Sequence, residues 1–139
     1  MDPRCLIGPV VIALFSGVVA SPAVAAWPPD GVILCSAPDD QTVRDIMADG
    51  AGGAFVVWSN AGSRLLFVHR IGGDGAIAPG WPECGVPVSP TAPSNFGVGN
   101  VATAPDGAGG LFVVWSSGPT DGEHPFVQHV TSSGAIAAG

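Results

Sequence analysis

Two Asp-Gly turns carry the residues whose type and spacing best suit a metal ion. Each has the form D-G-A-G-G, and the two begin at Asp49 and at Asp106. A hard cation such as calcium needs several oxygen ligands converging in one loop, whereas each of these turns offers a single carboxylate. An aspartate followed by glycines is also typical of a turn in which the side chain caps its own backbone. We favour the capped turn, and we predict no metal and no other cofactor.

The three histidines are the next candidates for metal ligands. His124 and His129 are five residues apart, so on one strand their side chains would point to opposite faces and could not share a zinc ion. His69 lies in a different segment, and none of the three recurs at an equivalent position of the repeat described below. We interpret all three as ordinary polar residues of strands.

A hydrolytic site would need two facing carboxylates, or a serine, a histidine and an aspartate beside an oxyanion hole. The acids are scattered over predicted loops, no serine lies in a G-x-S-x-G elbow, and no glycine run has phosphate-loop or dinucleotide-loop spacing. The sequence therefore predicts no enzyme. One polar group suits recognition instead: Asp121, Glu123 and His124 lie in the most variable connection, which makes them a candidate ligand-binding loop.

The segments that would position these residues form two copies of one repeat unit. W-P-x-x-G-V recurs at an offset of 54 residues, D-G-A-G-G-x-F-V-V-W-S at 57, and F-V followed by G-A-I-A at 59. The growing offset confines the length variation to connections. We assign residues 27–80 to the first unit and 81–139 to the second. The tryptophans could stack on sugars, but their pairing between units, Trp27 with Trp81 and Trp58 with Trp115, indicates repeated core packing.

The apolar runs of the first unit have the length of strands and are bounded by turn residues, at Asp45–Ala48, Ala54–Ser59, Leu65–Ile71 and Gly85–Ser89, of which the last is shared with the start of the second unit. Ala54–Trp58 is apolar throughout, which predicts a strand covered on both faces. We expect Leu65–Ile71 to lie nearer an edge, because it contains polar His69 and Arg70. The fold class is thus all-β, with about two four-stranded antiparallel propeller-like blades in tandem. A small β-sandwich built from the same strands is the alternative.

The repeated string D-G-x-G-G-x-F-V-V-W-S, followed by F-V-x-[RH]-[IV], G-A-I-A-x-G and W-P-x-x-G-V, resembles the tandem β-propeller-like repeats of large secreted bacterial proteins. The resemblance covers nearly all of residues 27–139, and it implies architecture more than activity. The chain departs from the family pattern at two places in each unit. Asn60 and Ser117 stand where an acid follows the tryptophan, and Phe67 and Phe126 replace a tyrosine.

The first 26 residues have the features of a secretory signal peptide. An apolar run, Cys5–Ala20, is followed by a proline and by small residues in the A-x-A pattern, which predicts cleavage after Ala25 or Ala26. An uncleaved membrane anchor is the alternative. We expect a secreted protein, periplasmic or extracellular, with no membrane span after cleavage. Cys35 and Cys84 would then lie in an oxidising compartment, but their repeat positions differ, so the sequence leaves their pairing open.

Composition limits the partners. The chain has 139 residues, of which 21 are glycine and 14 proline, which excludes a helical bundle. Its net charge of -7 has the wrong sign for binding nucleic acid. Two blades would leave apolar faces uncovered. We therefore expect either part of a longer repeat array or self-association.

The function that we predict is that of a secreted or cell-surface repeat module, with a structural role or an extracellular ligand that the sequence does not name. A fragment of an exported, glycosidase-like propeller hydrolase is the alternative.

Overall fold

A computed structural model describes residues 27–89, 98–119 and 122–138, and every regular element in these ranges is a β-strand. The predicted all-β class is therefore confirmed, while the predicted signal peptide, residues 1–26, lies outside the described residues. The strands are β1 (Gln41–Ala48), β2 (Ala54–Asn60), β3 (Leu66–Ile71), β4 (Val86–Pro87), β5 (Gly99–Pro105), β6 (Leu111–Ser117) and β7 (His124–Val130).

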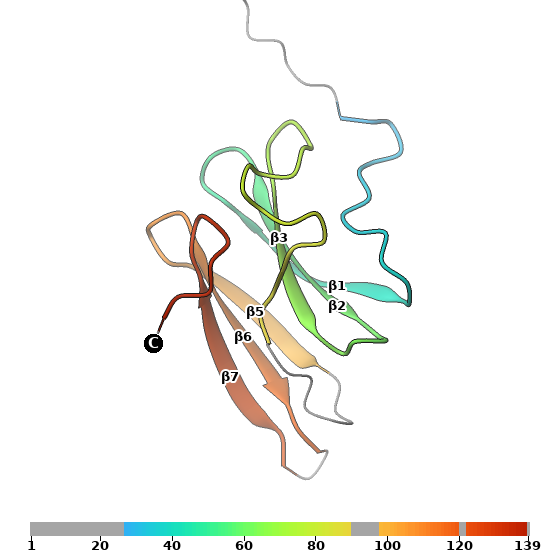
Figure 1. The fold of residues 1–139 in the computed structure, drawn as a ribbon. Helices are drawn as coiled ribbons and strands as arrows, with labels where there is room; N and C mark the ends of the chain where they lie inside the picture. Colours follow the sequence, from blue (N-terminus) through green and yellow to red (C-terminus); the bar gives the residue numbers. More distant parts are fainter. Residues whose placement is uncertain (1–26, 90–97, 120–121, 139) are drawn as a thin grey trace, which may run out of the picture.

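The strands form two antiparallel sheets in which neighbours along the chain are neighbours in the sheet (Figure 1). Sheet 1 has the order β1-β2-β3-β4, and sheet 2, within the described residues, has the order β5-β6-β7. Repeated residues occupy the same register in both sheets, since Trp58 lies opposite Phe67 and Trp115 lies opposite Phe126. The sheets are thus two versions of one meander.

The position of β3 differs from the expectation. We expected Leu65–Ile71 nearer an edge, but β3 lies between β2 and β4, with Phe67 opposite Pro87. His69 is fully buried on this strand. The prediction was wrong because it took a polar side chain as a sign of exposure, whereas β4 and the segment before β1 enclose this part of the sheet.

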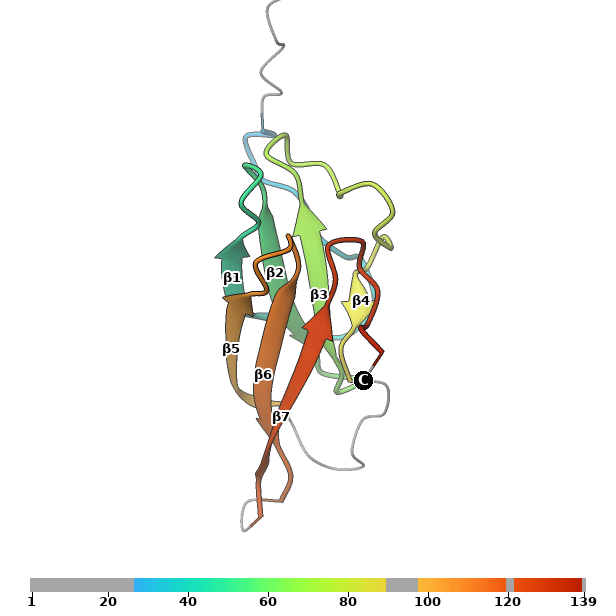
Figure 2. The same ribbon diagram turned by 90° about the vertical axis from the view of Figure 1, so that its left-hand side faces the viewer.

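The two sheets lie face to face as two layers, with their first strands, β1 and β5, on the same side (Figure 2). The hydroxyl of Thr103 on β5 donates a hydrogen bond of 2.8 Å to the carboxylate of Asp45 on β1. Apolar side chains from both layers form one hydrophobic core. Its members are Phe55, Val57, Leu66, Val68, Ala78, Trp81, Val86, Val88, Leu111, Val113, Trp115 and Val130.

The two sheets contribute different faces to this core. Sheet 1 contributes Phe55 and Val57 of β2, whereas sheet 2 contributes Leu111 and Val113 of β6. The repeat aligns Phe55 with Phe112, which points the other way and is partly exposed. The units therefore stack head to tail, with one face of the first against the opposite face of the second. Because sheet 1 is also covered outside, the apolar run in β2 is covered on both faces, as predicted, from Phe55 to Trp58.

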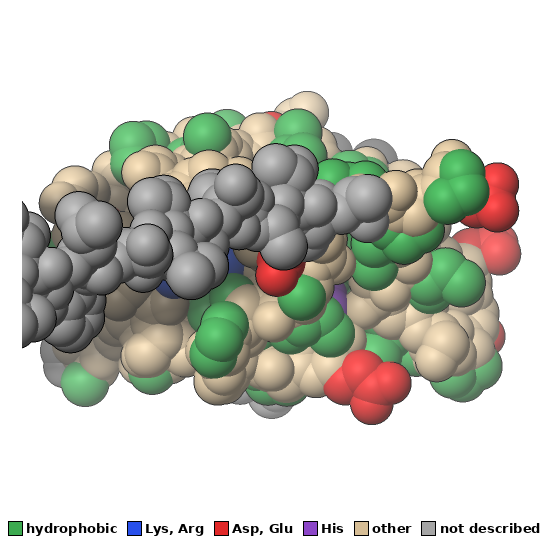
Figure 3. All heavy atoms as spheres, turned by 90° about the horizontal axis from the view of Figure 1, so that it is seen from above, with side chains coloured by type: hydrophobic (Ala, Val, Ile, Leu, Met, Phe, Trp, Pro, Cys, Tyr) green, Lys and Arg blue, Asp and Glu red, His purple; other side chains and the backbone are tan. Residues whose placement is uncertain are grey.

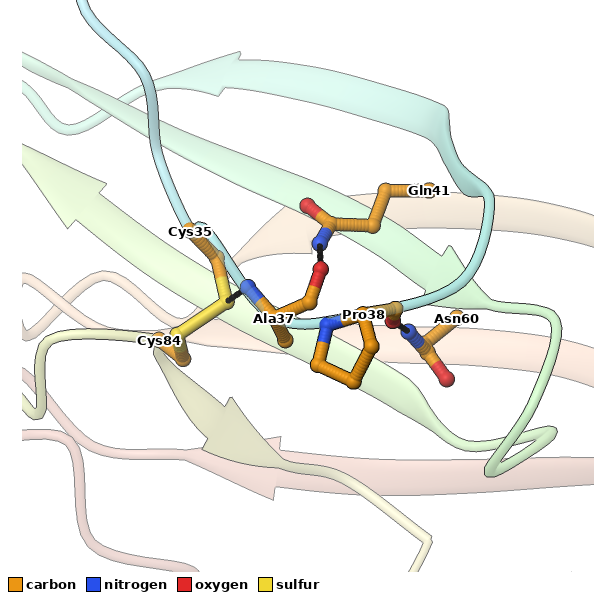
Figure 4. Close-up of a disulfide and its surroundings, with 6 residues drawn as sticks. All are labelled: Cys35, Ala37, Pro38, Gln41, Asn60 and Cys84. Carbon is orange, nitrogen blue, oxygen red and sulfur yellow. Dashed lines mark hydrogen bonds between the residues drawn. A yellow bond between two sulfur atoms is a disulfide. The ribbon is translucent and has the colours of Figure 1, made fainter.

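The segment before β1 covers the outer face of sheet 1, and a disulfide between Cys35 and Cys84 fastens it there (Figure 4). The pairing that the sequence left open is therefore present in the structure. Beyond the disulfide, the side chain of Asn60 donates to the carbonyl of Pro38 at 2.9 Å, and that of Gln41 donates to the carbonyl of Ala37 at 2.8 Å. The first bond ties the segment to the end of β2, and the second ties it to the start of β1.

Candidate binding rim

The first Asp-Gly turn, between β1 and β2, is a capped turn. One carboxylate oxygen of Asp49 accepts hydrogen bonds of 2.8 Å from the backbone N–H groups of Ala51 and Gly53. The other oxygen accepts a bond of 2.9 Å from Nε of Arg70 on β3 and lies 2.8 Å from another nitrogen of the same guanidinium. All the contacts of this carboxylate are structural. Gly53 must be glycine here, because an added Cβ would overlap the carbonyl of Ile71.

The second turn repeats this arrangement with a different base. Asp106 accepts from the N–H groups of Ala108 and Gly110, at 2.7 and 2.8 Å, and its other oxygen lies 2.8 Å from Nε2 of His129. His129 occupies the position on β7 that Arg70 occupies on β3, since each lies opposite the first phenylalanine of the neighbouring strand. The interpretation of these turns as backbone caps agrees with their geometry.

The surroundings of the two aspartates lower their pKa. Burial raises the pKa of Asp49, but the N–H groups of Ala51 and Gly53 and the Arg70 guanidinium outweigh it, so the net pKa is below the ordinary value. For Asp106, the hydrogen bond to His129 is the largest cause of a lowered pKa, and the turn N–H groups add to it. Both carboxylates therefore stay ionised over the neutral range, as turn caps should.

The three histidines have different surroundings in the structure. No group of three or more His, Cys, Asp or Glu side chains that could hold a metal is found in residues 27–89, 98–119 and 122–138. His129 is bonded to Asp106, His124 is exposed at the first position of β7, and His69 is buried on β3. Burial lowers the pKa of His69, although the backbone of Pro82 acts weakly in the opposite direction.

Sequence reasoning missed the burial of His69. Neither of its ring nitrogens has a hydrogen-bond partner with good geometry, which is costly for a buried polar group. Its place opposite Val56, a residue of the apolar run Ala54–Trp58, was the available signal. This signal requires the register of β2 and β3 to be known.

The candidate ligand-binding loop lies at the end of the molecule opposite to the Asp-Gly turns, at the bottom of Figure 1. We call this end the rim, and it comprises the loops that follow β2 and β6. Glu123 and His124 lie next to each other there and are both exposed. Asp121 lies outside the described residues. The structure thus leaves two of the three predicted side chains accessible on the rim.

The rim also holds an arginine pair that sequence reasoning missed. Arg44 of β1 and Arg64 of the loop after β2 line one hollow of about 350 Å³, together with Ser59, Asn60 and Val98. Nε of Arg44 donates to the hydroxyl of Ser59 at 2.9 Å. The remaining arginine after residue 26, Arg70, is committed to Asp49. The small number of arginines in the sequence was the available signal for this pair. Only the fold shows that Arg44 and Arg64 line the same hollow.

The opposite end has a different character. Seen from the side of the Asp-Gly turns, the part of the surface that grey atoms leave visible shows hydrophobic and acidic side chains among other side chains and backbone (Figure 3). The two ends differ in how arginine is used: Arg70 at the turn end is bound to Asp49, whereas Arg44 and Arg64 line the hollow on the rim.

Comparison of the chain with protein-family models, with curated proteins and with solved structures found no match in any of the three. Among the described residues, no helix is long and apolar enough to span a membrane.

Proposed function

We propose that the chain is a secreted or cell-surface repeat module, built of propeller-like blades, that acts by binding or as a structural element rather than by catalysis. The main support is that recurring and non-recurring polar residues have different places in the structure. Those that recur in both units, Asp49 and Asp106, are used as turn caps with Arg70 and His129. Four polar residues that do not recur, Arg44, Arg64, Glu123 and His124, lie instead on the rim, where recognition loops of repeat proteins usually lie.

Two observations support blades over a sandwich. Each sheet is a meander whose first strand lies beside the first strand of the other sheet, as in blades arranged around an axis. The stacking is also head to tail, so the same operation can be repeated by further units. A sandwich of two equal sheets related by a two-fold axis would instead bring equivalent faces together.

The hollow between Arg44 and Arg64 suits an anionic group. A guanidinium binds a carboxylate through two parallel hydrogen bonds, and two arginines beside the hydroxyl and amide of Ser59 and Asn60 offer several donors in one place. We therefore propose that the hollow binds one carboxylate of an acidic extracellular ligand, such as the carboxylate of a uronic acid sugar.

A titration followed by NMR tests the binding proposal. We expect a uronic acid oligosaccharide to shift amide signals at Thr42–Arg44, at Ser59–Arg64 and near His124, while a neutral oligosaccharide of equal length does not. The double variant Arg44→Gln/Arg64→Gln should lose the response, whereas Asp74→Asn, at the turn end, should keep it. Shifts confined to the turn end would contradict the proposal.

An assay with glycoside, ester and peptide substrates tests the absence of catalysis. We expect no turnover by the purified chain. Turnover that is abolished in Asp121→Ala, Glu123→Ala or His124→Ala would overturn the non-catalytic role and favour the hydrolase.

The proposal of export rests on the sequence of residues 1–26. Amino-terminal sequencing of the exported protein should start at Ala26 or at Trp27, and an intact Met1 would contradict cleavage.

A further inference from the structure

The outer face of sheet 2 is apolar and uncovered. Phe112 and Val114 of β6 are 39% and 42% exposed, whereas the equivalent residues of sheet 1, Phe55 and Val57, are 1% and 0% exposed. The difference arises because sheet 2 packs on sheet 1, while no described residue packs on sheet 2 from outside. The same face is thus an interior surface in one unit and a free surface in the other.

The outer side of sheet 1 carries a groove. It has a volume of about 450 Å³ and lies between the sheet and the segment before β1. Its apolar lining includes Trp27, Val32, Leu34, Ala54, Val56 and Ile71.

The equivalent surface of sheet 2 is filled. The repeat aligns these lining residues with Trp81, Val86, Val88, Leu111, Val113 and Val130, all of which belong to the shared core. Phe55 of sheet 1 lies in this place, with its ring centre 5.7 Å from that of Trp81. The groove of sheet 1 therefore has the same kind of lining as the surface of sheet 2 that receives Phe55, but no phenylalanine of the described residues occupies it.

The polar contacts beside the two tryptophans also correspond between the groove of sheet 1 and the filled surface of sheet 2. The carbonyl of Ser132 accepts from the indole of Trp81 at 3.3 Å and from Arg70 of the opposite sheet at 3.2 Å. The equivalent carbonyl, that of Gly73, accepts from the indole of Trp27 at 2.9 Å. The residue equivalent to Arg70 is His129, which lies beside Phe112 with ring centres 4.7 Å apart. His129 is thus the side chain that would approach the Gly73 carbonyl.

We propose that copies of this chain associate head to tail, with Phe112 of one copy in the groove of the next. The occupant is a second copy because each chain carries both halves of the contact, and because the contact between sheets 1 and 2 shows these surfaces fitting each other. The interface is heterologous, so it generates a ring where the rotation closes and a filament where it does not. This inference goes beyond the proposed function, since it does not depend on what the rim binds.

Sedimentation equilibrium of the exported chain tests the proposal. We expect a mass of at least two copies at micromolar concentration, with dissociation on dilution. Phe112→Asp should raise the dissociation constant by roughly 30-fold or more, as expected for a central aromatic anchor. Ala54→Trp, which fills the groove, should have a similar effect. A monomeric parent chain would overturn the proposal and would indicate that another kind of unit covers sheet 2.

A mixing experiment separates head-to-tail association from other modes. Phe112→Asp retains the groove, and Ala54→Trp retains the phenylalanine, so an equimolar mixture should form a dimer that neither variant forms alone. Failure of the mixture to dimerise, with both variants folded by circular dichroism, would overturn the proposal.

Ile33→Asp is the matched control. Ile33 is 82% exposed, and its equivalent, Pro87, remains exposed beside the internal interface. The variant should assemble like the parent chain. Loss of assembly in this variant too would indicate non-specific apolar association and would overturn the proposal.

Discussion

Two buried polar side chains of this protein have opposite surroundings. Asp49 is buried, but two backbone N–H groups and a guanidinium satisfy its carboxylate. His69 is buried with no partner of good geometry for either ring nitrogen. A buried group without partners disfavours its charged form, which is why burial lowers the pKa of His69. The histidine is therefore a pH-sensitive weakness of the fold.

We predict that His69 makes the protein less stable in mild acid. Its pKa in the native state is lowered from an ordinary value of 6.5, so below that pH the unfolded chain takes up a proton that the native state refuses. The free energy of unfolding should fall as the pH drops below 6.5, by at most about 1.4 kcal/mol per pH unit. Urea denaturation from pH 7.5 to pH 5 measures it.

His69→Gln provides the control, because glutamine is the residue at the equivalent position, Gln128. The stability of the variant should depend less on pH over this range than that of the parent chain. Parallel pH profiles for the two proteins would show that His69 does not titrate as described.

At the scale of elements, the segment before β1 covers the outer face of sheet 1, where no second sheet packs in the described residues. It buries Val56 and Trp58 on the outer face, although it forms no regular strand. Its attachment depends on the bond between Cys35 and Cys84 and on the bond from Trp27 to the Gly73 carbonyl. The segment therefore links residues far apart in the sequence.

Removing the disulfide should destabilise the protein substantially. The bridge spans 49 residues, and closing a loop of this length stabilises a fold by about 4 kcal/mol in the chain-entropy model. Urea denaturation of Cys35→Ser/Cys84→Ser should show a loss of this order, and reductant should have the same effect on the parent chain but none on the variant. Equal stability of parent and variant without reductant would contradict the bridge.

The elements also show what the sequence could and could not predict. The Asp-Gly turns, the strand at Ala54–Ser59 and the strand at Leu65–Ile71 follow from local signals, because glycines and apolar runs mark them directly. The disulfide did not follow from the repeat, because Cys35 aligns with Ser89, and only the folded segment brings Cys35 beside Cys84. The arginine pair on the rim likewise depends on β1 meeting the loop after β2.

At the scale of the whole molecule, the repetition in the sequence becomes a repeated packing step. Each unit presents a phenylalanine beside a basic side chain, Phe55 with Arg70 and Phe112 with His129. The surface that receives the phenylalanine consists of small and branched side chains and a tryptophan. Phe55 and Trp81 make this contact within the chain. The sequence predicted two similar sheets. It could not predict which face of one sheet packs on which face of the other, because in a strand that is apolar throughout the side chains of either face can form a core.

The most direct test of this account is a nuclear Overhauser measurement of which faces meet. Head-to-tail stacking predicts contacts from the Phe55 ring to the Trp81 indole and from the methyl groups of Val57 to those of Leu111 or Val113. The measurement is made on the parent chain at high dilution, where only contacts within one copy remain. Contacts between equivalent residues under those conditions, Phe55 with Phe112 or Val57 with Val114, would instead show a two-fold sandwich and contradict the account.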